Sequence, residues 1–443
     1  MLNPTHPSNK IAGIAMLAVV LLPCASPVHA QDRIVDGYLL NLELGVLQSD
    51  NPLGNSPRGP SDTLMVPRAE FDVHRHGSQW TARGSGYMEY RVALDNVVED
   101  EFRANLAAAL DWTLLPGSLD WTFQNVASVE PIDFLGTDSS GNLQQTNIFM
   151  TGPTWQIRPM SRWGGVVDAR YTHSYAEESE AFNSDRVSVS GRLLHRFDVN
   201  RQMSLGAEVT DVRYRDSDIA ATDYERLDLL ARYRSQAAQT ELEVAGGHTW
   251  IEPEQGQSIT APLARIHWIW NRNDHNSIRI LALHEQSDST RQLSGEIDQI
   301  GRPFAGVSRM PVDAELFQLT SIEPSWHYRH PRGHLSVRTF YRELEFEFAP
   351  ASDFHEIGTN LDGSWRLRPL TTLLASLGLE RRKFSSEQRR DTDHRASLFL
   401  EHRFTQRWSA RAGATRYQRS SSVAGADSRE HIYAVYLTFR AGR

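Results

Sequence analysis

The chain has 443 residues, a formal net charge of −9, 40% hydrophobic residues and a mean hydropathy of −0.47. Beyond its first segment, no run approaches the roughly 18 consecutive apolar residues that a membrane-spanning helix needs, so a helical membrane protein is excluded. Acidic residues outnumber basic ones by 55 to 46, and all basic residues except Lys10 and Lys383 are arginines, which argues against a general nucleic-acid binder.

The first segment predicts a secretory signal peptide. Lys10 precedes an apolar stretch, and a small-residue site fits cleavage after Ala30. Residues 1–30 would then be removed, leaving residues 31–443 as one domain. The only cysteine, Cys24, lies within the signal, so the exported chain would contain no disulfide. A lipidated protein that retains this cysteine is the alternative.

Strict alternation of apolar and polar residues recurs along nearly the whole exported chain, in segments of about 10 to 15 residues. In the segment after Gln79, the apolar face comprises Trp80, Ala82, Gly84, Gly86, Met88, Tyr90 and Val92, and the polar face comprises Thr81, Arg83, Ser85, Tyr87, Glu89 and Arg91. The pattern recurs at 102–112, 357–368 and 396–404. It predicts about 20 strands, with 18 as the alternative.

Short and long connections alternate between these segments. Tight turns are expected near residues 76–77, 115–117, 158–160, 198–200, 235–237, 271–275, 330–333, 368–369 and 405–406. Longer polar stretches separate them, and those at 128–145 and 287–313 are long enough to fold inward as constrictions. The sequence therefore predicts an all-β, antiparallel, up-and-down transmembrane β-barrel with short periplasmic turns, longer extracellular loops and both ends in the periplasm. A soluble sandwich is the alternative; a propeller would need a repeat, which the sequence lacks.

Tryptophans are concentrated near the predicted tight turns. An indole ring favours the membrane interface, where its N–H reaches water. The expected interfacial tryptophans are Trp80, Trp112, Trp121, Trp155, Trp163, Trp268, Trp270, Trp326, Trp365 and Trp408, whereas Trp250 lies near a long loop.

The last predicted strand, 431–439, resembles the aromatic-ended strand that the outer-membrane barrel assembly machinery recognises, although residues 440–443 follow the aromatic. We therefore expect an outer-membrane location, in contact with membrane lipid and lipopolysaccharide. No plug-sized segment precedes the first strand, which disfavours a TonB-dependent receptor.

Arginines are frequent on the predicted inward face. They are Arg83, Arg91, Arg103, Arg170, Arg192, Arg232, Arg265, Arg279, Arg338, Arg366, Arg395 and Arg411. Guanidinium groups bind carboxylates and phosphates, so these residues are candidates for guiding an anionic solute or polymer. The alternative is that they pair with carboxylates on neighbouring strands and stiffen the wall. The inward aromatics Tyr87, Phe340, Phe399 and Tyr417 would stack either on sugar rings or against these arginines.

Motifs of enzymes, metal sites and cofactor sites are missing: the sequence has no Gly-x-Ser-x-Gly elbow, no His-Glu-x-x-His pair and no phosphate loop. We expect no enzyme, metal or cofactor, with a barrel enzyme as the remaining alternative. The acidic stretch Asp216, Asp218, Asp223 and Glu225 lacks the spacing of a dedicated calcium site. The simpler interpretation is that these acidic residues belong to an outer loop that contacts lipopolysaccharide and its divalent cations.

The sequence resembles, diffusely, the EpsL-like or "beta-barrel porin 2" family associated with exopolysaccharide biosynthesis. The resemblance rests on Ser61-Asp62, on residues 142–153, on Asp223-Tyr224-Glu225-Arg226 and on residues 365–372. It implies export of a polysaccharide across the outer membrane with periplasmic export partners. A diffusion porin for small solutes and a structural or adhesin-like surface barrel are the alternatives.

Overall fold

The computed structural model describes residues 36–54, 57–134, 136–137, 139–159, 161–215, 223–294, 311–385 and 389–441. Residues from Asp36 onward form one compact unit. The predicted signal peptide, residues 1–30, lies outside the described residues and stays a prediction. Among the described residues, no helix is long and apolar enough to cross a bilayer.

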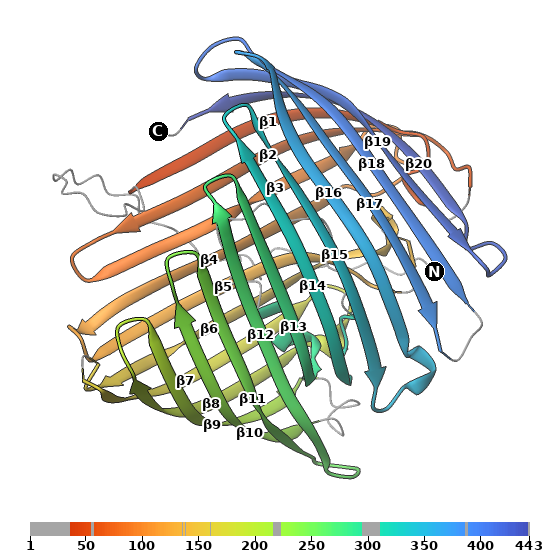
Figure 1. Ribbon diagram of the computed structural model, residues 1–443. Coiled ribbons are helices and arrows are strands. Elements are labelled where there is room, and N and C mark those ends of the chain that lie inside the picture. Colours follow the sequence, from red (N-terminus) through yellow and green to blue (C-terminus); the bar gives the residue numbers. More distant parts are fainter. Residues whose placement is uncertain are drawn as a thin grey trace, which may run out of the picture. The chain divides into compact units, whose positions relative to one another are not determined.

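Twenty strands form one antiparallel sheet that closes on itself (Figure 1). The first ten are β1 (Gly37–Ser49), β2 (Asp62–His76), β3 (Trp80–Ala93), β4 (Glu101–Leu115), β5 (Leu119–Pro131), β6 (Leu143–Ile157), β7 (Trp163–Ala176), β8 (Ser184–Arg196), β9 (Arg201–Tyr214) and β10 (Tyr224–Gln236). The others are β11 (Thr240–Pro253), β12 (Ile259–Asn273), β13 (Asn276–Asp288), β14 (Leu316–His330), β15 (Gly333–Phe346), β16 (Phe354–Arg368), β17 (Thr371–Phe384), β18 (Arg390–Arg403), β19 (Trp408–Ser421) and β20 (Ser428–Arg440). The described helices are α1 (Ser289–Ser294) and the short 3-10 turns η1 (Ser140–Asn142), η2 (Glu180–Phe182) and η5 (Pro350–Ser352).

Each strand pairs with the next along the chain, and β1 also pairs with β20, so that the sheet has no free edge. Closure satisfies the backbone hydrogen bonds of every strand, which a lipid environment requires. The predicted up-and-down barrel of 20 strands is confirmed, and the alternative of 18 strands is wrong.

The outer wall is apolar because every second residue points outward. On β8, Val187, Val189 and Leu193 are 52–54% exposed, whereas the alternate Arg186 is buried inside the barrel. A continuous apolar surface of this extent is unstable in water and matches a lipid environment. A strand of 13–15 residues tilted by about 40° rises roughly 33 Å, enough for an apolar band of about 25 Å.

The two mouths of the barrel differ in their connections. Every tight turn that the sequence predicted joins strands at one mouth, here called the short-turn mouth, and the longer connections lie at the other, the long-loop mouth. Asn41 near the start of β1 pairs with Arg440 at the end of β20, so both ends of the barrel chain lie at the short-turn mouth.

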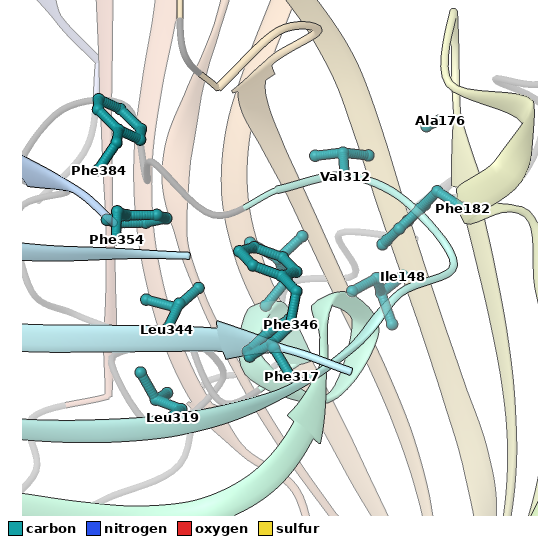
Figure 2. Packing of buried hydrophobic residues seen from close by; sticks show 11 residues of the cluster. Ile148, Ala176, Phe182, Val312, Phe317, Leu319, Leu344, Phe346, Phe354 and Phe384 are labelled. Carbon is teal, nitrogen blue, oxygen red and sulfur yellow. The ribbon is translucent and has the colours of Figure 1, made fainter. Parts of the chain in front are cut away.

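Buried apolar residues gather inside the barrel near the long-loop mouth, not in its outer wall. The largest cluster combines residues from opposite parts of the wall: Ile148, Ala176, Phe182, Leu293, Val312, Phe317, Leu319, Leu344, Phe346, Phe354 and Phe384. Figure 2 shows Val312, on the chain that precedes β14, between Phe182 on one side and Phe346 on the other. The barrel therefore has a folded interior at this mouth.

Candidate functional site

The interior of the barrel is filled at the long-loop mouth and more open at the short-turn mouth. Inward-facing Asp62, Ser184 and Asp391, at the long-loop ends of their strands, are 0% exposed. Near the short-turn mouth, the inward side chains of Arg83 and Asp111 are 43% and 37% exposed. A barrel of this size cannot fill its lumen with its own wall side chains, so other segments must do so.

The connection between β5 and β6 supplies one of these segments. Phe134 stacks on Phe346 with ring centroids 6.0 Å apart and lies 5.8 Å from Phe354, on strands across the barrel. Arg382 of β17 donates a hydrogen bond of 2.9 Å from Nη1 to the carbonyl oxygen of Phe134. Arg419 of β19 donates in the same way to the carbonyl oxygen of Gly136. The predicted inward folding of this loop is thus present.

The connection between β13 and β14 supplies the second segment. α1 starts directly after Asp288, whose Oδ1 accepts a hydrogen bond of 3.1 Å from the backbone N–H of Arg291. Leu293 is 1% exposed in the apolar cluster, together with Val312 on the chain that leads into β14. Residues 295–310 of the predicted inward loop lie outside the described residues. The described parts on both sides of them pack inside the barrel.

Two ion pairs, one of them with the buried Asp228, attach α1 to the wall. Arg291 Nη2 lies 3.1 Å from Asp228 Oδ2 on β10, and its Nη1 lies 3.8 Å from Glu208 Oε1 on β9. Asp228 also accepts two hydrogen bonds from Arg226 Nε, at 3.0 and 2.9 Å. Removing one member of a buried ion pair leaves the other charge uncompensated, which typically costs about 3–5 kcal/mol.

Asp288 connects this network to strands that are not its neighbours. Arg186 on β8 contacts its Oδ1 at 2.7 Å, and the Tyr224 hydroxyl on β10 donates to its Oδ2 at 2.8 Å. These contacts cross the interior and not the sheet. They brace the lumen at the level of α1.

Two carboxyls on the chain that leads into β14 have altered acidity. Burial raises the pKa of the Glu315 carboxyl to about 7, and the negative charge of Asp313 adds to the shift. Burial also raises the pKa of Asp313, partly offset by the backbone N–H of Glu315, which donates to it at 3.0 Å. Between them, Ala314 packs in a buried cluster with Tyr214 and Tyr224.

Most of the predicted inward arginines contact carboxylates. Within 4.0 Å the pairs are Arg83–Asp111, Arg91–Glu89, Arg103–Glu101, Arg170–Asp168, Arg192–Asp168, Arg232–Glu243, Arg265–Glu285, Arg338–Glu323 and Arg411–Glu43. Arg279 lies on β13 with a buried Nε. Five of these pairs join neighbouring strands, as the wall-stiffening interpretation expects, whereas three lie within a single strand and Arg411–Glu43 spans β20. A role for these residues in guiding a solute stays a prediction.

Arg366 and Arg395 differ from the nine arginines in these pairs, because no carboxylate of the described chain lies within 4.0 Å of either. Arg395 stacks over the ring of Tyr417 at 5.1 Å. The other inward aromatics also face arginines: Tyr87 with Arg68 at 3.9 Å, Phe340 with Arg342 at 5.5 Å and Phe399 with Arg411 at 5.6 Å.

The predicted interfacial tryptophans lie in the parts of their strands nearest the short-turn mouth. Exposed fractions of 37–55% place the following on the outer wall: Trp80, Trp112, Trp155, Trp163, Trp326, Trp365 and Trp408. Trp121, Trp268 and Trp270 are half-buried at the same level, and Trp250 lies near the long-loop end of β11. Their contact with the membrane interface stays a prediction.

The sequence reasoning missed the arginines that hold the inward segments or bind the carboxylates to which those segments attach, above all Arg186, Arg226, Arg291, Arg382 and Arg419. Arg226 and Arg382 each stand two positions from an acidic residue on the same strand face, Asp228 and Glu380. That spacing was an available signal. Of the acidic stretch considered for calcium, Asp216 and Asp218 lie outside the described residues, and Asp223 accepts a hydrogen bond of 2.7 Å from the backbone N–H of Tyr214. Among the described residues, no three His, Cys, Asp or Glu side chains form a metal-binding group.

No protein-family model and no curated protein matches the sequence. Among solved structures, the siderophore receptor PirA from Acinetobacter baumannii aligns at a TM-score of 0.50 and 8% identity, covering 92% of this chain and 81% of that one. PirA from Pseudomonas aeruginosa aligns at 0.44 and 11%, covering 91% and 80%. The ferric-catecholate import receptor Fiu from E. coli K12 aligns at 0.44 and 9%, covering 92% and 82%. The chain has the fold of an outer-membrane β-barrel. At these identities the likeness concerns the fold alone.

Proposed function

We propose that the protein is an outer-membrane channel that its own inward segments hold closed at the long-loop mouth. The observation that carries the proposal is the attachment of α1 to the inner wall by Arg291, in a barrel whose other mouth is more open. A closed 20-strand wall with an apolar outside supports the membrane location. We place the barrel so that the short-turn mouth faces the periplasm and the long-loop mouth faces the cell exterior, where lipopolysaccharide lies.

Removing the Arg291 side chain tests the proposal. Arg291→Ala leaves Asp228 and Glu208 without this partner and weakens the attachment of α1 to the wall. In planar bilayers, wild-type protein should open rarely, and Arg291→Ala should give more frequent or larger conductance steps. Arg201→Ala is the control, because it removes an exposed ion pair with Asp198 at the short-turn mouth. Equal conductance in all three folded proteins would contradict the proposal.

We further propose that the solute carried by this channel is a polysaccharide. The resemblance to the EpsL-like family favours export of a polysaccharide, driven by periplasmic partners, and the lumen contains the arginines and aromatics that such a chain would meet. A deletion strain should then lose secreted polymer or accumulate it in the periplasm. Unchanged polymer in both compartments would instead favour uptake of small solutes or a structural role at the surface.

A further inference from the structure

Two small clefts at the short-turn mouth share residues. The first, about 190 Å³, is lined by Arg366, Pro369, Leu370, Thr372, Glu401 and Arg403. The second is lined by Glu401 and Arg403 again, and also by Arg407, Trp408 and Arg440 among others. Because the clefts have Glu401 and Arg403 in common, they form one continuous surface. We call Arg366, Arg403, Arg407 and Arg440 the arginine arc.

The arginine arc departs from the charge pattern of the rest of the lumen. Elsewhere most inward arginines have a carboxylate within 4.0 Å, whereas in the described part of the chain none of these four has one. Glu401 is the one carboxylate that lines either cleft. All four arginines are exposed. The surface therefore carries positive charge that the protein does not neutralise. Pairing with carboxylates to stiffen the wall does not explain why these arginines are there.

The strand register places Arg366 and Arg403 on the same inward face. Arg366 on β16 pairs with Thr372 on β17, and Thr372 pairs with Glu401 on β18. Arg403, two residues beyond Glu401 on the same strand, faces the same side. Only β17 lies between their strands, so two inter-strand spacings and the two-residue offset put the backbones of Arg366 and Arg403 about 12 Å apart. Guanidinium groups at this spacing can each take a separate anionic group of one extended ligand.

We propose that the arginine arc binds an anionic solute, or a charged stretch of an anionic polymer, through its carboxylate or phosphate groups. The arc would concentrate this ligand at the short-turn mouth before it reaches the constriction at α1. The inference rests on the proposed channel function for its role in transport. Binding itself does not require an open pore, so the two can be tested separately.

Titration calorimetry on the detergent-purified full-length barrel tests the proposal, with sodium tripolyphosphate and a galacturonate trimer as probes. The test variant is Arg366→Gln/Arg403→Gln. The matched control is Arg158→Gln/Arg162→Gln, which removes the same charge from exposed residues around the turn between β6 and β7, outside the arc. Thermal unfolding shows whether both variants stay folded.

Wild type and the control should bind at least one probe equally well, more weakly at higher salt, and the test variant should bind at least about tenfold more weakly. Binding of tripolyphosphate alone would assign a phosphate-bearing ligand, and binding of the galacturonate would assign a carboxylate polymer. Failure of wild type to bind either probe, or equal weakening in both variants, would overturn the proposal. If Arg291→Ala still opens the channel in that case, only the arginine arc fails.

Discussion

Arg291 of α1 lies 3.1 Å from Asp228 of β10, and this contact fixes a segment from inside the barrel to its wall. Arg226 holds the same carboxylate from the wall side at 2.9 Å. The Asp228 carboxylate thus forms ion pairs with one arginine of its own strand and with one arginine of the inward segment. In the proposed closed channel, the attachment of α1 depends on the carboxylate of Asp228, and loss of a partner from a buried ion pair is costly and local.

Arg382 should hold the other inward segment. Its side chain is 1% exposed and binds Glu356, Glu380 and the carbonyl oxygen of Phe134. Arg382→Ala should lower the free energy of unfolding by about 3–5 kcal/mol and make the chain at Phe134 accessible to chymotrypsin. Urea unfolding in detergent and limited proteolysis measure the two effects. Arg201→Ala, which removes an exposed pair, should change stability by no more than about 1 kcal/mol; a similar loss in both variants would contradict this role.

Rising pH should loosen the segment before β14. The Glu315 carboxyl has a pKa of about 7 in place and an ordinary value of 4.5 when released, so the seated segment binds more protons. Its stability should be greatest below pH about 4.5 and fall as pH rises through about 7. Hydrogen exchange of residues 311–315 across this range measures the change. Glu315→Gln should reduce the pH dependence, and an unchanged profile would disprove the assignment.

Trp155 should lie at the membrane interface. Its side chain is 55% exposed on the outer wall of β6, close to the turn that follows Ile157. In liposomes, lipids brominated near the headgroup should quench its fluorescence more strongly than lipids brominated near the bilayer centre. The difference between wild type and Trp155→Phe isolates its signal. Stronger quenching from the centre would show that the predicted tryptophan belt lies at another depth.

The wall of the barrel was predictable because a strand repeats every two residues. Trp80 and Arg83 stand on opposite faces of one alternating segment, and the structure places the first on the outer wall and the second inside. Turn residues such as Pro116 and Gly117 marked the hairpins. The same alternation restricts the register between neighbouring strands, because a slip by one residue would turn every inward charge of a strand to the outer wall.

The inward segments were predictable only as long loops. The bond from Arg382 to the carbonyl oxygen of Phe134 joins residues 248 positions apart, and no local pattern specifies such a contact. Arg291 lies in a six-residue helix that is too short to show a periodic signal. The same limit applies to the arginine arc, which exists only because β16, β18, β20 and the turn before β19 bring their arginines to one mouth.

The most direct test of the closed-channel account is to lock α1 in place. The chain outside the predicted signal has no cysteine, so Leu293→Cys/Ile148→Cys in the Arg291→Ala background gives one defined pair from a single buried cluster. Conductance in a planar bilayer is recorded before and after a bis-maleimide cross-linker is added. A channel closed by α1 should show openings before cross-linking and lose them afterwards, and the cross-linker should have no effect on Arg291→Ala alone. Openings that persist unchanged after cross-linking would contradict it.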